Sequence, residues 1–548
     1  MKTIATMAWT LALLLLAGAT GAWAHDEAGG GSGDPARLGE VNFPVSCNTA
    51  ARQEFNRGMA LFHSFWFDPA KQSFAKVLEH DPQCGMAHWG LAIMAMGNPF
   101  GWPPNPKALA AGAAAAAEAQ RIGAGTGRER DYIAALAVFF KDRQTTAHRP
   151  RAIALEQALA ALAARYPDDV EAQILYALIL NVTALPTDKS FANQLKAAAI
   201  LEPLARRYPR HPGITHYLIH TYDYAELAVR GLPFARAYAA IAPSVPHVQH
   251  MPSHIFSRLG MWPEMVTANE ASYRAAKAEL KASTLGIGTY DALHAMDYLV
   301  FGQLQQARDQ AAKKLVDEVA AIAKVNVENF VAAYAFAAIP ARFALERGDW
   351  RQAAALQLAP ATLAWDKFPQ AEAILVFARA LGAARSGDVA AGRKDVARLQ
   401  ALQQAMTAAN NGYWAGQTAF QIKAVDAWIA LADNRPEEGL ELMREAAKME
   451  EASDKHPVTP GTIVPARELL GEMLLALGRP GEALTQFERS LKRDPNRFRG
   501  IAGAARAAEI AGDRATAAEY YDRLQDLTAA GDGERPELAE ARAFLARN

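Results

Sequence analysis

The sequence predicts an all-α fold, an α-solenoid of antiparallel helix pairs, from three observations. Strand signals are nearly absent, while Ala, Leu, Glu, Arg and Gln dominate and apolar residues recur at helical spacing, most clearly at 107–120 and 152–165. Turn signals such as Tyr166-Pro167 and Asp494-Pro495 end one helix and start another. The 548 residues exceed what one compact core accommodates, at about 100–200 residues per domain, so a repeat array or several domains are needed.

The N-terminal residues 1–24 have the pattern of a signal peptide. Lys2 supplies the positive charge, the apolar run at 11–16 follows, and Ala22-Trp23-Ala24 is a small-residue cleavage site. An uncleaved anchor helix is the alternative, although the apolar run is short. Residues 25–46, which include the Gly-rich run at 29–33, are expected to form a flexible linker.

Localisation and charge limit the partners that we expect. No later apolar run approaches the ~20 residues of a membrane helix, so we expect a periplasmic or secreted protein with no membrane span after signal cleavage. Lys and Arg total 57 and Asp and Glu 58, a formal net charge of -1, which argues against a general nucleic-acid binder.

The chain has two cysteines, Cys47 and Cys84. An exported protein meets an oxidising environment, which favours a disulfide between them over two free thiols. Neither cysteine belongs to a C-x-x-C motif, so a redox dithiol and c-type haem attachment are unsupported.

Internal repeats carry the more specific prediction. Near the C-terminus, Gly471, Ala483, Phe487 and the closing Pro495 form a pattern that resembles the tetratricopeptide repeat (TPR). Its small residue, Ala and aromatic residue recur with a period of 34 at Ala505, Ala517 and Tyr521. The N-terminal unit Gly58, Ala70, Phe74 and Pro82 repeats it. The resemblance implies a right-handed superhelix of antiparallel helix pairs.

Turn residues divide the rest of the chain. A ladder of residues suited to positive φ separates helical patterns: Gly260, Gly302, Gly348, Gly387, Asn434, Gly478 and Gly512. We therefore expect TPR-like repeats at 47–97, a Pro/Trp loop and irregular helical region at 98–165, elongated TPR-like repeats with a His-rich groove at 166–452, TPR repeats at 453–531 and a capping helix at 532–548. An ordinary irregular α-bundle is the alternative for 98–165.

Histidines gather in one stretch of the predicted repeats. His216 and His220 share a helix face, and His250 and His254 repeat that spacing 34 residues later, so the four occupy equivalent positions on successive helices. In TPR proteins these positions face the concave groove. The other residues expected on that face or at its edge are Asp223, His247, Arg258 and His294. Pro252 is expected to kink its helix and to rotate His254 away.

Two functions are compatible with this cluster. In the first, the groove binds a peptide, a protein or a small ligand. In the second, His216, His220, His250 and His254 bind Zn²⁺ or Cu²⁺, which suit imidazole ligands, in a metal carrier or a hydrolase with Asp223 as the base. No H-E-x-x-H motif, phosphate-binding Gly-rich loop or G-x-S-x-G motif is present, so we favour a binding protein over an enzyme and predict no certain cofactor.

The segments at 55–65, 81–90, 211–220 and 250–256 resemble exported bacterial TPR proteins whose role is largely unassigned. That resemblance implies a superhelical scaffold with a protein or peptide partner. It implies no established activity.

Overall fold

The computed structural model describes residues 38–278 and 287–547. The predicted signal peptide at 1–24 lies outside the described residues. The prediction of a flexible linker at 25–46 is wrong for its last part, because Leu38, Phe43 and Val45 are buried. The ring of Phe43 packs 4.9 Å from that of Tyr132, so these apolar side chains tie the segment to the helices.

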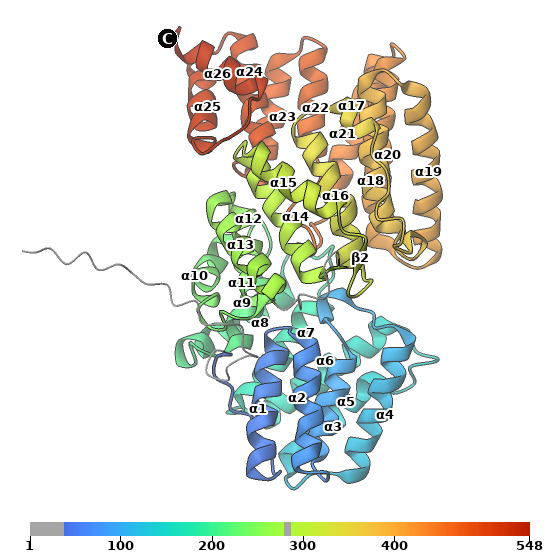
Figure 1. Ribbon diagram of the computed structural model, residues 1–548, viewed down its shortest axis with the longest axis vertical. Helices are drawn as coiled ribbons and strands as arrows, with labels where there is room; N and C mark the ends of the chain where they lie inside the picture. Colours follow the sequence, from blue (N-terminus) through green and yellow to red (C-terminus); the bar gives the residue numbers. More distant parts are fainter. Residues whose placement is uncertain (1–37, 279–286, 548) are drawn as a thin grey trace, which may run out of the picture. The chain divides into compact units, whose positions relative to one another are not determined.

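The described residues form helices almost throughout (Figure 1). The first are α1 (Thr49–His63), α2 (Phe67–His80), α3 (Gly85–Ala95), η2 (Pro99–Gly101), α4 (Pro106–Ile122), α5 (Gly127–Phe140), α6 (His148–Arg165), α7 (Val170–Thr183) and α8 (Ala192–Arg207). Next are α9 (Pro212–Tyr222), α10 (Ala228–Tyr238), α11 (Pro246–His250), α12 (Pro252–Leu259), α13 (Trp262–Ala278), α14 (Tyr290–Gln305), α15 (Asp309–Ala320), α16 (Phe330–Glu346) and α17 (Trp350–Ala354). The last are η4 (Trp365–Lys367), α18 (Pro369–Ser386), α19 (Val389–Ala408), α20 (Gly412–Ala432), α21 (Pro436–Glu451), α22 (Ala466–Ala476), α23 (Pro480–Arg493), α24 (Phe498–Ala511), α25 (Arg514–Leu527) and α26 (Pro536–Leu545).

Neighbours in the sequence are neighbours in space, since most helices pack against the next one along the chain. The strands in the described part of the chain are β1 (Ile287–Gly288) and β2 (Lys324–Val325), which pair in parallel. The predicted all-α, TPR-like solenoid is confirmed.

The predicted TPR packing is visible where an aromatic residue meets two small ones. A Cβ at Gly471 or at Gly503 would lie 2.6 or 2.4 Å from the ring of Phe487, which therefore fills the space between α22 and α24. Phe74 does the same between Gly58 of α1 and Gly90 of α3. Glycine at these positions lets each second helix insert its aromatic ring between two neighbours.

The turn ladder is confirmed at six of its seven positions, where φ lies between 61° and 96°: Gly260, Gly348, Gly387, Asn434, Gly478 and Gly512. It is wrong at Gly302, which lies inside α14. A Cβ there would come within 2.7 Å of the Met265 side chain, so this glycine permits close helix packing and the turn falls at Ala307, with φ 53°.

Two predicted regions differ in detail. Within 98–165, the Pro/Trp loop ends at Asn105, and α4, α5 and α6 then pack in sequence like the repeats around them. Residues 453–465, predicted as the start of the C-terminal repeats, form no helix. We call them the crossover segment, because Lys455 in it reaches Asp223, 232 positions earlier.

The side chain of Arg342 anchors the crossover segment. Its guanidinium donates to the Thr459 hydroxyl at 2.6 Å and to the Gly461 carbonyl at 2.9 Å, while Asp297 balances its charge at 2.8 Å. Both members of that ion pair are fully buried. The crossover segment is thus held to α14 and α16 by a buried guanidinium that has no access to water.

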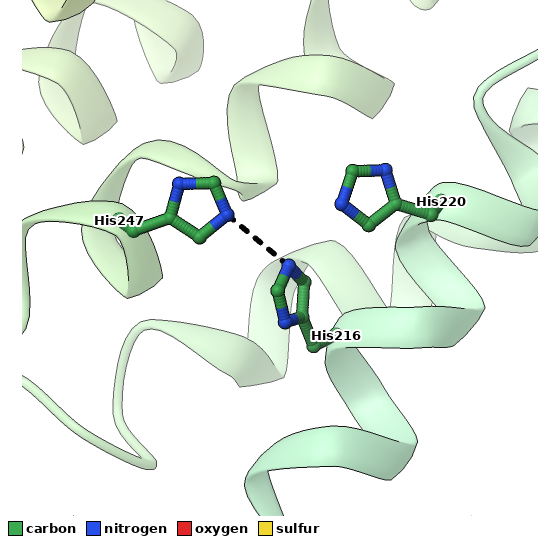
Figure 2. A group of neighbouring side chains, drawn as sticks. All are labelled: His216, His220 and His247. Atoms are coloured by element: carbon green, nitrogen blue, oxygen red, sulfur yellow. Dashed lines mark hydrogen bonds between the residues drawn. The ribbon is translucent and has the colours of Figure 1, made fainter. Parts of the chain in front are cut away.

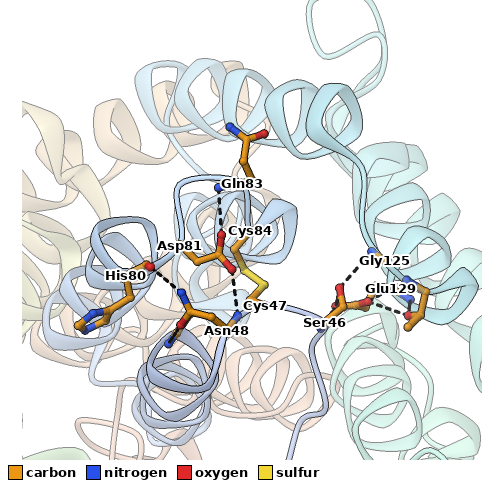
Figure 3. Close-up of a disulfide and its surroundings, with 11 residues drawn as sticks. Ser46, Cys47, Asn48, His80, Asp81, Gln83, Cys84, Gly125 and Glu129 are labelled. Carbon is orange, nitrogen blue, oxygen red and sulfur yellow. Dashed lines mark hydrogen bonds between the residues drawn. A yellow bond between two sulfur atoms is a disulfide. The ribbon is translucent and has the colours of Figure 1, made fainter.

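The predicted disulfide joins Cys47 and Cys84, with Cα atoms 5.4 Å apart (Figure 3). Cys47 precedes α1 and Cys84 immediately precedes α3. The same two ends are also linked by hydrogen bonds from Asn48 to Asp81 and to the carbonyl of His80. No helix in the described ranges is long and apolar enough to cross a membrane.

Removing the disulfide tests its contribution to stability. The bond closes a loop of 37 residue steps, so Cys47→Ser/Cys84→Ser should lower the free energy of unfolding by roughly 3–4 kcal/mol. Chemical denaturation of oxidised, reduced and variant protein measures this. The reduced native protein should have the same free energy of unfolding as the double variant. Equal stability of all three samples would contradict the prediction.

Candidate metal centre

Four helices supply the histidines of the site. His216 and His220 lie on α9, His247 and His250 on α11, His254 on α12 and His294 on α14. Pro252, which lacks an N–H, ends α11 and starts α12, as predicted for a break in this helix. The expected rotation of His254 is wrong, because Met251 keeps helical dihedrals (φ -54°, ψ -36°) and the ring still faces His250.

The first trio comprises His216, His220 and His247, whose rings turn toward one another (Figure 2). The Nε2 atoms of His216 and His247 are 3.2 Å apart. The Nε2 atom of His220 is buried without a hydrogen-bond partner. One nitrogen from each ring lies within 4.8 Å of the other two.

The second trio comprises His250, His254 and His294 and meets the same distance limit. The Nε2 atoms of His250 and His254 are 3.1 Å apart, and the His294 ring lies 4.3 Å from that of His250. The predicted set of four is thus divided between two trios. His220 and His254 remain neighbours across the division, with ring centroids 5.5 Å apart.

Hydrogen bonds on the far side of three rings determine where their protons lie. The Nδ1 atom of His216 donates to the His63 carbonyl at 2.6 Å, that of His250 to Asn269 Oδ1 at 2.7 Å and that of His254 to Asp223 Oδ2 at 2.9 Å. The Asn269 amide orientation is fixed because its nitrogen donates to the Met265 carbonyl. In a neutral ring, the proton on Nδ1 leaves Nε2 as an unprotonated acceptor.

Asp223 balances the charges around the second trio. It pairs with Arg258 at 2.8 Å and Lys455 at 3.0 Å, and its side chain is only 5% exposed. Burial alone would raise the pKa of this carboxyl, but Lys455 and Arg258 bring it well below the usual range. Burial also lowers the pKa of Lys455 to about 8. Asp223 is therefore an anion already engaged by three donors.

A third group supports the first trio from behind. Glu171 accepts from Nε2 of His63 at 2.9 Å and from Nε2 of His211 at 3.0 Å. Burial alone would raise the pKa of Glu171, but the two imidazoles bring it below its ordinary value. Because each contact is an ordinary hydrogen bond and Tyr217 occupies Nδ1 of His63, this group positions the carbonyl that His216 uses.

Burial keeps the imidazoles of both trios neutral. It lowers the pKa of all six: His216, His220, His247, His250, His254 and His294. Neighbouring imidazoles add to the effect at every one of these except His254. At His254 the effect of burial exceeds that of Asp223, which acts in the opposite direction.

The prediction of an open groove lined by these residues needs correction. His216 is 0% exposed, His250 and His254 are 2% exposed, and Arg258 is buried behind Asp223. A peptide could not contact these four side chains, whereas His247 and His294 are half-buried. Of the predicted residues, only His220 and Asp223 border a described pocket. The missed residues are His63, Glu171, Asn269 and Lys455. No sequence signal marks Asn269 or Lys455, since both lie in segments outside the histidine-bearing helices.

No protein-family model matches the sequence, and no curated protein matches it. Among solved structures, the chain is similar to the human IFIT1 dimer with m7Gppp-AAAA, at 12% identity and a TM-score of 0.38 over 89% of this chain and 91% of that one. It is also similar to the APC/C hetero-tetramer Cut9-Hcn1, at 10% identity and a TM-score of 0.36 over 91% and 76%. The helix pairs and the buried imidazoles define a TPR-like helical-repeat protein with a histidine cluster.

Acid should unfold this protein through the cluster. A buried histidine with a depressed pKa takes up a proton more readily in the unfolded chain, so its contribution to stability is present above about pH 6.5 and is lost as the pH falls. At pH 5, each imidazole that stays neutral in the folded protein lowers the free energy of unfolding by about 2 kcal/mol relative to neutral pH. Urea unfolding of chelator-treated protein between pH 7.5 and 5 measures the loss.

Two variants separate the cluster from general acid effects. His250→Gln keeps a donor for Asn269 and should make the acid loss smaller by about 2 kcal/mol. His80→Gln, at an exposed position, should leave it unchanged. Identical pH profiles for the native protein and His250→Gln would refute the assignment.

Proposed function

We propose that this protein binds transition-metal ions, copper or zinc, on its two histidine trios, one ion on each. The helical repeats serve as the scaffold that holds the four histidine-bearing helices in place. The first site is formed by His216, His220 and His247, and the second by His250, His254 and His294.

The observation that carries the proposal is the facing pair His250 and His254. Both rings place Nδ1 against an acceptor, so both Nε2 atoms are lone pairs, and these lie 3.1 Å apart. Two unprotonated nitrogens at this distance repel each other. A proton between them would create a buried imidazolium, which burial disfavours. A metal ion accepts both lone pairs and removes the conflict.

The nitrogen separations suit such an ion. Zn–N bonds of 2.0–2.1 Å in a tetrahedron separate neighbouring nitrogens by roughly 3.3 Å. The observed separations are 3.1 Å for His250 and His254 and 3.2 Å for His216 and His247. The unpartnered Nε2 of His220 supplies a third ligand to the first site.

The surroundings have the features of a metal site. A ligating histidine usually donates its other N–H to a carboxylate or a carbonyl, as His254 does to Asp223 and His216 does to His63. Ligands that are all imidazole favour copper and zinc over magnesium and calcium. Three protein nitrogens leave one tetrahedral position for water or a small ligand.

Metal binding or transfer fits this site better than hydrolysis. Asp223, the base that a hydrolase would need, already accepts from His254, Arg258 and Lys455. Its low pKa makes it a poor proton acceptor. We therefore propose a metal-holding protein rather than a metal-dependent hydrolase.

Export to the periplasm or the medium remains part of the proposal. The cleavable pattern at 1–24 supports it, and so does the disulfide, since such bonds persist in oxidising compartments. A protein or peptide partner, expected from the TPR resemblance, stays a prediction.

Elemental analysis tests the metal proposal. Protein purified without a tag or chelator, or loaded with Zn²⁺ or Cu²⁺, should hold two ions per chain. His216→Gln/His247→Gln and His250→Gln/His254→Gln should each lose one. A metal at 100 times its dissociation constant should stabilise the native chain by about 2.7 kcal/mol for each occupied site.

The matched control is His80→Gln/His88→Gln, which removes two histidines outside both trios and should retain both ions. The proposal fails if no transition metal co-purifies and added Zn²⁺ and Cu²⁺ leave the melting temperature unchanged.

A further inference from the structure

A pocket of about 350 Å³ lies beside the histidine cluster, and the metal proposal does not use it. Its walls come from the Pro/Trp loop, the start of α6, the ends of α7 and α9, the start of α20 and the crossover segment. His220 and Asp223 form part of its lining. The volume is in the range of small-molecule sites.

The aromatic residues of the pocket provide flat apolar surface. Phe100, Trp102, Tyr224 and Tyr413 all line it. The ring of Phe100 is stacked on His220, with centroids 3.8 Å apart and planes 19° apart. Such walls favour a planar ligand that can stack between them.

Two polar atoms of the lining are buried without partners, namely Oδ1 of Asn181 and Nδ1 of His148. The Asn181 side chain is oriented by its amide nitrogen, which donates to Thr221 Oγ1 at 2.8 Å, while that hydroxyl donates to the Tyr217 carbonyl. Oδ1 of Asn181 is therefore an acceptor that lacks a donor. A buried acceptor without a donor costs about 1–3 kcal/mol, which a ligand hydroxyl would recover.

The charges of the lining favour an anion. Its two carboxylates are already paired with cations, Asp454 with Lys189 and Asp223 with Arg258. Lys455 shares Asp223 with Arg258 and thus has no carboxylate of its own. Arg149 donates to the Thr183 carbonyl and makes no ion pair within the described residues. Lys455 and Arg149 leave the pocket with surplus positive charge.

We propose that this pocket binds a small aromatic carboxylate that carries a hydroxyl group. The carboxylate lies against Lys455 and Arg149, the ring lies between the aromatic walls, and the hydroxyl donates to Oδ1 of Asn181. This goes beyond metal binding and does not depend on it, because neither cation nor Asn181 belongs to a histidine trio.

Isothermal titration calorimetry at pH 7 tests the proposal with the three hydroxybenzoate isomers, benzoate, neutral benzamide and cyclohexanecarboxylate. We expect the best hydroxybenzoate to bind about tenfold more tightly than benzoate, since it adds one hydrogen bond to a buried acceptor. Benzamide and cyclohexanecarboxylate should each bind at least tenfold more weakly than benzoate.

Variants assign the contacts. Asn181→Leu should remove the advantage of the hydroxyl and leave benzoate binding unchanged. Arg149→Gln should weaken all the carboxylates several-fold, whereas Arg165→Gln, an exposed arginine outside the pocket, should have no effect. Unchanged thermal unfolding verifies that each variant is folded.

Three results would overturn the proposal. One is that none of the probes binds. Another is that benzamide binds as well as benzoate, or that Asn181→Leu weakens both acids equally. The third is binding that requires loaded Zn²⁺ and disappears after chelation, since the carboxylate would then be a metal ligand. Binding that survives chelation supports the pocket even if the metal proposal fails.

Discussion

One buried negative charge, that of Asp223, organises the second histidine trio and its surroundings. Taking a carboxylate out of water costs several kcal/mol unless charged donors compensate. Loss of any of its three donors would therefore leave a buried charge without full compensation. The bond to Asp223 fixes the proton of His254 on Nδ1. Arg258 holds α12 against the end of α9, and Lys455 links the crossover segment to the cluster. The facing nitrogens of His250 and His254, and the pocket wall that the crossover segment forms, depend on these contacts.

Local patterns predict most of the fold. Helical spacing, turn residues and the 34-residue period all act within one or two helices, which is why the Phe487 packing and the turn at Asn434 could be foreseen. The Cys47–Cys84 disulfide also joins adjacent helix pairs. Where the rule failed, at Gly302, glycine served close packing rather than a turn, and sequence alone does not distinguish these uses.

The site could be predicted only in part. Spacing placed His216, His220, His250 and His254 on neighbouring helices. Their division into two trios depends on His247, at the start of α11, and on His294, on α14. Contacts between distant segments leave no periodic trace. Lys455 therefore had no signal, since it belongs to a segment without repeat structure, and the pocket had none because its lining comes from several segments far apart in the sequence.

The crossover segment sets the order in which the protein is completed. A chain made from its N-terminus at 5–20 residues per second needs roughly 10–50 s to add the 232 positions between Asp223 and Lys455. During that time Asp223 lacks Lys455, one of its two cationic partners, and the part of the pocket wall that the crossover segment supplies is missing. The early helix pairs can form as they emerge, whereas the cluster reaches its final, water-excluded state only when the chain has been extended through the crossover segment.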